Sequence, residues 1–140
     1  MVYLDTSAAI PMFVREPNSD AVEKWFATSD APLISADWIL TEFSSALALK
    51  VRRGELSKNQ ARAARLEFAV FSQSGLRLIA VSRQAFRSAA ELASETASGL
   101  RSGDSLHLAV ALEAKISNMV TADGNLLRNA EAKGIAVIRV

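Results

Sequence analysis

Four acidic residues occupy positions where a carboxylate contributes little to folding but could do chemistry. Asp5 and Asp123 each follow a short apolar run, Glu42 interrupts an otherwise apolar helical segment, and Asp104 stands at the start of a second helix. If the apolar runs form adjacent parallel strands, all four carboxylates can converge at one edge of a sheet. Converging carboxylates repel one another strongly and need a cation between them. The pattern therefore predicts a site for a hard divalent ion with oxygen ligands, Mg²⁺ or Mn²⁺.

Short apolar runs alternate with longer helical patterns along the whole chain. The pattern predicts strands at residues 2–4, 33–35, 76–81, 118–121 and 135–140. It predicts helices at residues 7–14, 18–28, 36–53, 57–75, 83–98, 104–114 and 126–133, with a capping box formed by Ser57 and Gln60. Strands separated by helices imply βαβ units and a mostly parallel sheet, in which sites form at the carboxyl ends of strands.

The composition sets limits on the class of protein. The chain has 140 residues, half of them hydrophobic, a net charge of +1 and no cysteine. We therefore expect a single domain over residues 1–140, without disulfides, thiolate nucleophiles or cysteine-based metal sites. We expect no signal peptide and no membrane span, and a cytoplasmic location.

Each of the four acids also has an ordinary structural explanation. Asp5 and Asp104 could simply cap helices, and Asp123 could be a turn residue. Glu42 could be a solvated residue at the edge of its helix's apolar stripe, although no basic residue lies three or four positions away to pair with it. The joint placement of the four acids favours the metal site.

The single histidine and a short motif beside it suggest other chemistry. His107 could join the site, but a lone helical histidine is more often a structural residue, and we favour that role. Residues 103–106 spell GDSL, a serine-hydrolase signature. A catalytic pair is disfavoured, because Ser105 and His107 are two residues apart and point away from each other on a helix.

Four segments together resemble the PIN-domain family, and within it the VapC toxins of toxin–antitoxin pairs. The segments are Tyr3–Ser7, Thr41-Glu42, Arg101–Ala109 and Thr121–Asp123, and they follow the family's order and spacing over nearly the whole chain. The resemblance implies an α/β fold, a three-layer α/β/α sandwich with a mostly parallel central sheet. It also implies a metal-dependent ribonuclease that hydrolyses RNA phosphodiester bonds with Mg²⁺ or Mn²⁺.

The family's site residues carry over onto five positions of this chain. The acidic quartet corresponds to Asp5, Glu42, Asp104 and Asp123, and the hydroxyl after the first acid corresponds to Thr6. We expect Asp5 and Asp104 to bind the metal directly and Asp123 to bind it directly or through water. Glu42 would bind the metal or orient the attacking water, and Thr6 would hold a carboxylate or a metal-bound water.

The resemblance also bears on the metal count and on partners. Some family members have a further acid shortly after the last aspartate, where this chain has Gly124 and Asn125, so a second ion would bind weakly. The resemblance implies a VapB-like antitoxin whose tail enters the active site, and a homodimer. We also expect two apolar residues on the Glu42 face of the helix, Trp38 and Leu49, to be exposed, and this favours a homodimer.

Two other functions stay open at the level of sequence. A phosphotransfer or phosphatase domain with Asp5 as nucleophile would form a covalent aspartyl-phosphate. A non-catalytic PIN-like module would bind RNA or protein without cleavage.

Arg53 lies on nearly the same helical face as Glu42, about 16 Å along the axis, a distance that suits a phosphate a few nucleotides from the metal.

Overall fold

The computed structural model describes all 140 residues and contains one five-stranded sheet in which every pair of neighbours is parallel. The strand order is β3-β2-β1-β4-β5. The strands are β1 (Val2–Leu4), β2 (Leu33–Ala36), β3 (Leu76–Ile79), β4 (Asn118–Thr121) and β5 (Ala136–Arg139). The expected parallel α/β architecture is confirmed.

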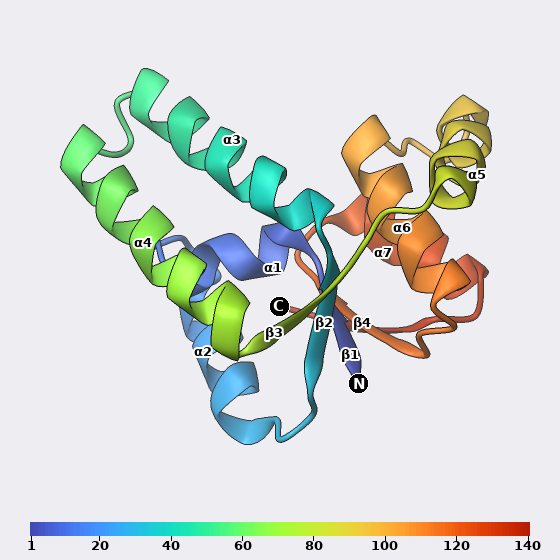
Figure 1. Ribbon diagram of the computed structural model, residues 1–140, viewed down its shortest axis with the longest axis horizontal. Coiled ribbons are helices and arrows are strands. Elements are labelled where there is room, and N and C mark those ends of the chain that lie inside the picture. Colours follow the sequence, from blue (N-terminus) through green and yellow to red (C-terminus); the bar gives the residue numbers. More distant parts are fainter.

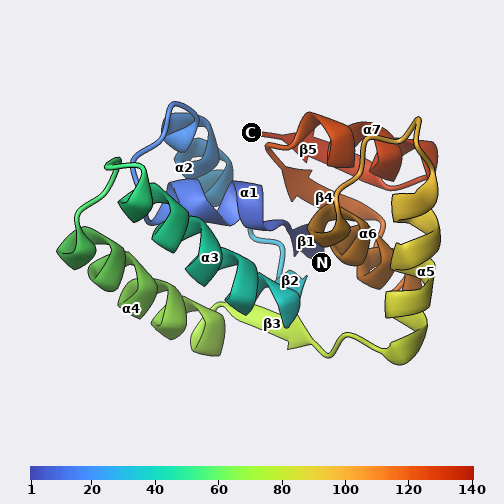
Figure 2. The same cartoon turned by 90° about the horizontal axis from the view of Figure 1, so that it is seen from above.

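Helices cover both faces of the sheet and produce three layers (Figures 1 and 2). One face carries α1 (Thr6–Ala9), a 3₁₀ turn (Ile10–Met12), α2 (Ser19–Thr28), α3 (Trp38–Arg52) and α4 (Lys58–Ser74). The other face carries α5 (Arg83–Ser94), α6 (Ser102–Glu113) and α7 (Gly124–Ala132).

The central strand β1 separates two apolar cores. Its side chains alternate between the two sides of the sheet, as the pleat requires. Val2 and Leu4 pack with the helices of α1–α4, whereas Tyr3 packs with α5–α7. All three residues are buried, which explains why this strand reads as a continuous apolar run.

The topology changes direction at β1. The chain first adds β2 and β3 on one side of β1 and later adds β4 and β5 on the other. A parallel sheet leaves a crevice outside the carboxyl ends of the two strands that flank such a switch point. Asp5 follows β1 directly and Asp123 lies two residues after β4, so both stand at this crevice.

Local signals explain most element boundaries. The capping box of α4 is present, since Ser57 Oγ accepts from the backbone N–H of Gln60 and the Gln60 side chain accepts from the backbone N–H of Ser57. Helix α5 ends at Ser94, four residues earlier than expected, because Glu95 adopts an extended backbone. No helix is both long and apolar enough to cross a membrane.

Candidate metal centre

Asp5 is held by hydrogen bonds to one of its two carboxylate oxygens. Its Oδ2 accepts from the Ser7 backbone N–H at 3.1 Å, from the Thr121 hydroxyl at 2.9 Å and from the Ser7 hydroxyl. The other oxygen, Oδ1, accepts no hydrogen bond and lies 3.7 Å from His107 Nε2. Asp5 therefore caps α1 with one oxygen and keeps the second free, although the residue is only 2% exposed.

Glu42 reaches the same place from the first turns of α3. Its Oε2 accepts from the Thr6 hydroxyl at 2.6 Å and lies 2.7 Å from His107 Nε2. Its Oε1 lies against the Cα of Gly103, where an added Cβ would come within 2.0 Å of it. Burial raises the pKa of Glu42, but the hydrogen bond and charge of His107 outweigh burial, so the pKa lies below its ordinary value. The carboxylate is therefore ionised and fixed by one oxygen.

Asp104 and Asp123 complete the acidic set from the starts of two helices. Asp123 caps α7, since its Oδ1 accepts from the backbone N–H groups of Asn125 and Leu126, both at 2.8 Å. Asp104 lies in the first turn of α6 and accepts a long hydrogen bond of 3.4 Å from the Arg101 backbone N–H. Burial and then the charges of Asp123 and Asp5 raise the pKa of Asp104 from 3.8 to about 6.

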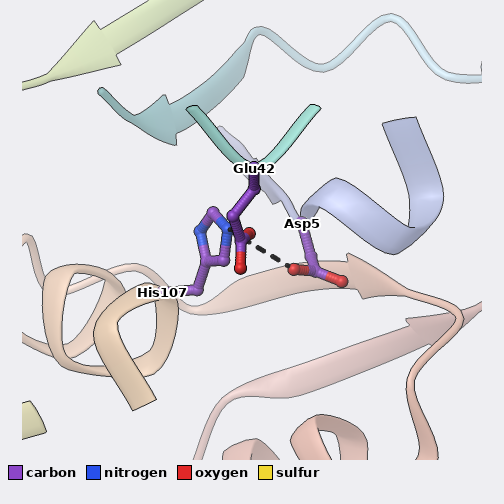
Figure 3. Close-up of side chains that lie close together, drawn as sticks. All are labelled: Asp5, Glu42 and His107. Carbon is purple, nitrogen blue, oxygen red and sulfur yellow. Dashed lines mark hydrogen bonds and ion pairs between the residues drawn. The ribbon is translucent and has the colours of Figure 1, made fainter. Parts of the chain in front are cut away.

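These four acids converge at the carboxyl edge of the sheet. Ligand-type atoms of Asp5, Glu42 and His107 all lie within 4.8 Å of one another, and the three side chains point toward a common centre (Figure 3). Glu42, Asp104 and Asp123 line one pocket of about 360 Å³. Each of the four carboxylates keeps one oxygen that accepts no hydrogen bond from the protein. This all-oxygen donor set fits Mg²⁺ or Mn²⁺.

His107 is buried and hydrogen-bonded, as a structural histidine would be, but its partners belong to the site. Its ring has no exposed surface, and Nδ1 lies 2.8 Å from the Tyr3 hydroxyl. Its Nε2 contacts Glu42 and also lies 3.0 Å from the Thr6 hydroxyl. Sequence reasoning left His107 at the margin of the site, whereas the structure places it directly behind Glu42.

Sequence reasoning missed the polar residues that hold the acids. Ser7 and Thr121 each donate to Asp5, and Tyr3 supports His107. Thr121 is fully buried at the end of β4, and a polar residue there is the one signal that could have indicated a second partner for Asp5. Gly103, to which the sequence assigns no role of its own, leaves the space that the Glu42 carboxylate fills.

The basic and apolar residues that the sequence singled out near the site differ in how exposed they are. Arg53 is exposed at the end of α3, and Leu49 is 37% exposed. Trp38 is less exposed than expected, because it is half-buried and its indole Nε1 is buried without a hydrogen-bond partner. Arg101 is the one basic residue that lines the acidic pocket.

Comparisons with known proteins agree with this architecture. No curated protein matches the chain. Solved structures resemble it over nearly their full length. One is VapC20 of Mycobacterium tuberculosis, described as a sarcin–ricin loop cleaving toxin, with a TM-score of 0.77, 18% sequence identity and 100% of both chains covered. Another is FitAcB of Neisseria gonorrhoeae, with a TM-score of 0.69, 16% identity and coverage of 99% of this chain and 97% of that chain. VapBC2 of Rickettsia felis, bound to a DNA fragment from its promoter, is also similar (0.66, 15%, 99% and 98%). Residues 2–132 match the sequence model of the PIN domain, so the chain belongs to the PIN-domain family.

Proposed function

We propose that this protein is an Mg²⁺- or Mn²⁺-dependent endoribonuclease, a single-domain toxin of a toxin–antitoxin pair. One observation carries the proposal: four carboxylates, each with one oxygen held by the protein and one free, meet at the switch point of a parallel sheet. Membership of the PIN-domain family and the similarity to VapC20, which is described as a sarcin–ricin loop cleaving toxin, support it.

In this proposal the protein's own residues hold and orient the metal. Asp5 and Asp104 are direct ligands through their free oxygens, and Asp123 binds directly or through water. Glu42 binds through Oε1 or orients the attacking water, while Thr6 fixes its Oε2. When bound, the ion supplies an activated water and neutralises the charge that develops on the phosphate.

The charge distribution of the pocket suits a phosphodiester only when a cation is bound. Four carboxylates repel an RNA backbone, and Arg101 is the one basic side chain that lines the pocket. We infer that Arg101 contacts a phosphate oxygen of the RNA once the acids are neutralised. No side chain needs to act as a general base, which agrees with a site whose single histidine is fully buried.

We infer two kinds of protein partner. A VapB-like antitoxin is supported by the similarity to VapBC2, a pair named together with its promoter DNA. A homodimer is supported by large apolar side chains that stay exposed, Leu49 on α3 and Phe86 on α5 among them. Light scattering of the isolated protein at micromolar concentration should report two chains per particle, and a monomer would count against the dimer.

The central experiment is Asp5→Asn, compared with the exposed Asp20→Asn as a matched control. Asn keeps the shape of the side chain and can still cap α1, but it removes one charge from the metal site. We expect RNA cleavage with Mn²⁺ to fall by orders of magnitude in Asp5→Asn, while melting in EDTA stays level or rises because a repulsion is relieved.

The result separates the proposal from its competitors. Full ribonuclease activity in Asp5→Asn would remove this residue from the mechanism and most of the proposal with it. A covalent phosphate on wild-type Asp5 and turnover of small phosphate esters would indicate a phosphotransfer domain instead. RNA binding by the wild type that never leads to cleavage with either metal would indicate a non-catalytic module.

A further inference from the structure

A chain of buried hydrogen bonds runs from the backbone of β2 to the metal site. The backbone N–H of Ala36 donates to the Tyr3 hydroxyl at 3.1 Å, and that hydroxyl lies 2.8 Å from His107 Nδ1. On the other side of the ring, His107 Nε2 lies 2.7 Å from Glu42 Oε2 (Figure 3). Tyr3 and His107 have no exposed surface, and their rings meet edge to face at 5.6 Å.

The direction of the protons along this chain follows from the partners. The Tyr3 hydroxyl can accept one hydrogen bond and donate another. The hydroxyl already accepts from Ala36, and His107 Nδ1 is the acceptor within reach of its proton. In a neutral ring the remaining proton must therefore be on Nε2, which faces Glu42. A doubly protonated ring also carries a proton there, so the assignment is the same in both charge states.

The alternative arrangement is physically unfavourable. If Nε2 carried a lone pair, two acceptors would face each other at 2.7 Å in a buried place, without a proton between them. Glu42 Oε2 also accepts from the Thr6 hydroxyl at 2.6 Å, as an ionised carboxylate oxygen does. Nε2 is therefore a donor to Glu42, with the Thr6 oxygen at 3.0 Å as a second neighbour.

We propose that His107 is a positioning residue, not a metal ligand: its Nε2–H holds Glu42 Oε2, and the Tyr3 hydroxyl fixes the ring in the orientation and tautomer that this requires. A histidine can bind a metal only through an unprotonated nitrogen, and both ring nitrogens are engaged in the hydrogen-bond chain. The held carboxylate then offers its free Oε1 at the site. The consequence for catalysis rests on the proposed function, whereas the hydrogen-bond assignment does not.

The direct test is nitrogen NMR on protein labelled with ¹⁵N-histidine, which gives one ring because the chain has one histidine. We expect a protonated Nε2 in EDTA, and a Nε2 that stays protonated when Mg²⁺ is added. Tyr3→Phe removes the donor to Nδ1 and should change the Nδ1 chemical shift, while Nε2 stays protonated because Glu42 still accepts from it. A Nε2 that is unprotonated in EDTA, or that loses its proton on binding Mg²⁺, would overturn the proposal.

Variants test what the hydrogen bond does, with Mn²⁺ affinity measured by calorimetry. His107→Leu removes the donor, and we expect Mn²⁺ binding to weaken about 10–100-fold. His107→Gln restores an N–H near the Nε2 position and should recover most of that affinity, which a mere packing role would not predict. Ser105→Ala is the matched control, because it removes a buried hydroxyl without a partner from the same helix.

Two outcomes separate this proposal from the ribonuclease proposal. If wild type never cleaves RNA but NMR and Mn²⁺ affinity behave as expected, the positioning role stands and the ribonuclease proposal fails. If His107→Leu binds Mn²⁺ as tightly as wild type, or if His107→Gln binds as weakly as His107→Leu while both melt cooperatively, the positioning role fails.

Discussion

At the scale of single residues, each carboxylate of the candidate site bonds to the protein through one oxygen and leaves the other without a hydrogen bond. Asp5 and Asp123 each use one oxygen to accept the backbone N–H groups that open a helix, and each leaves the other oxygen free. From the sequence, capping and metal binding are competing explanations for these acids. The structure makes them compatible, because a cap needs one oxygen and a ligand needs the other. A capping aspartate at the end of a parallel strand is therefore already oriented for the ligand role that we propose.

The negative charge of Asp104 is the least stabilised by the protein among the four site acids. This gives a prediction about the stability of the metal-free protein. Its pKa is raised to about 6, first by burial and then by Asp123 and Asp5, and its hydrogen bond is a long one. Asp104→Asn removes a charge that repels two neighbours. We expect the variant to melt at a higher temperature than wild type in EDTA near neutral pH, and to lose RNA cleavage.

The difference in melting temperature between wild type and Asp104→Asn should depend on pH, because proton binding to Asp104 is coupled to folding. The pKa of Asp104 is higher in the folded chain than its ordinary value of 3.8, so the folded state binds more protons. The contribution of Asp104 to stability is present below about pH 4 and is lost as the pH rises through about 6. Wild type should therefore approach Asp104→Asn in melting temperature as the pH falls from about 8 to about 5. A difference that stays constant over this range would contradict the raised pKa.

At the scale of elements, local signals in the sequence are enough to place most helices and strands. Ser57 and Gln60 form the expected capping box, and the run Val2–Leu4 is the expected buried strand. The predicted C-terminal end of α5, at residue 98, was wrong, because nothing in the sequence near Glu95 is a strong signal for the end of a helix. Boundaries of this kind depend on how the next segment packs, which the sequence does not state.

The residues that hold the site acids in place by hydrogen bonds could not be predicted in the same way. Asp5 and Asp123 were visible because they follow apolar runs, and Glu42 and Asp104 because an acid stands out within or at the start of an apolar helix. Thr6 was indicated only by the family resemblance. The contacts of Tyr3 with His107 and of Thr121 with Asp5 join residues more than 100 positions apart. Neither partner has a local pattern that reveals the pairing, so only the fold identifies it.

The close approach of α6 to α3 gives a prediction at this scale. Gly103 opens the space into which Glu42 places its Oε1, and a Cβ there would lie 2.0 Å from that oxygen. Gly103→Ala should push the carboxylate away from Thr6 and His107. We expect Mn²⁺ affinity, measured by calorimetry, to fall about 10–100-fold. Metal-free melting should change little, because alanine favours a helix by about 1 kcal/mol and offsets part of the lost contacts.

Gly124→Ala is the control for this substitution. Gly124 also lies in the first turn of a helix beside a site acid, but its added Cβ would meet only Arg128 Nη1, at 3.6 Å. Mn²⁺ affinity should stay at the wild-type value. Equal losses in both variants would mean that any added methyl group near the site is disruptive, and the specific role of Gly103 would be wrong.

At the scale of the whole molecule, the two cores hold the acids together against their repulsion. The sheet ends at Asp5 and near Asp123, α3 brings Glu42 from one layer, and α6 brings Asp104 and His107 from the other. The layers cannot separate to relieve the repulsion without exposing apolar surface, which costs about 25 cal/mol per Å². The metal-free protein therefore stores an electrostatic cost that a bound cation would remove.

This stored cost predicts that metal binding stabilises the folded chain. A ligand that binds only the native state adds RT ln(1 + [L]/Kd), which is about 2.7 kcal/mol at 100 times Kd. For a chain of 140 residues this corresponds to a rise in melting temperature on the order of 8 °C. Calorimetric melts of wild type at increasing Mn²⁺ should show this rise, and Asp104→Asn should show a much smaller one from a higher starting temperature. The wild-type curve should reach that of Asp104→Asn and then pass it as Mn²⁺ increases, because wild type binds the ion more tightly and gains more stability from it. A wild-type melt that does not move with Mn²⁺, or that moves equally in Asp104→Asn, would mean that the acids do not share one ion.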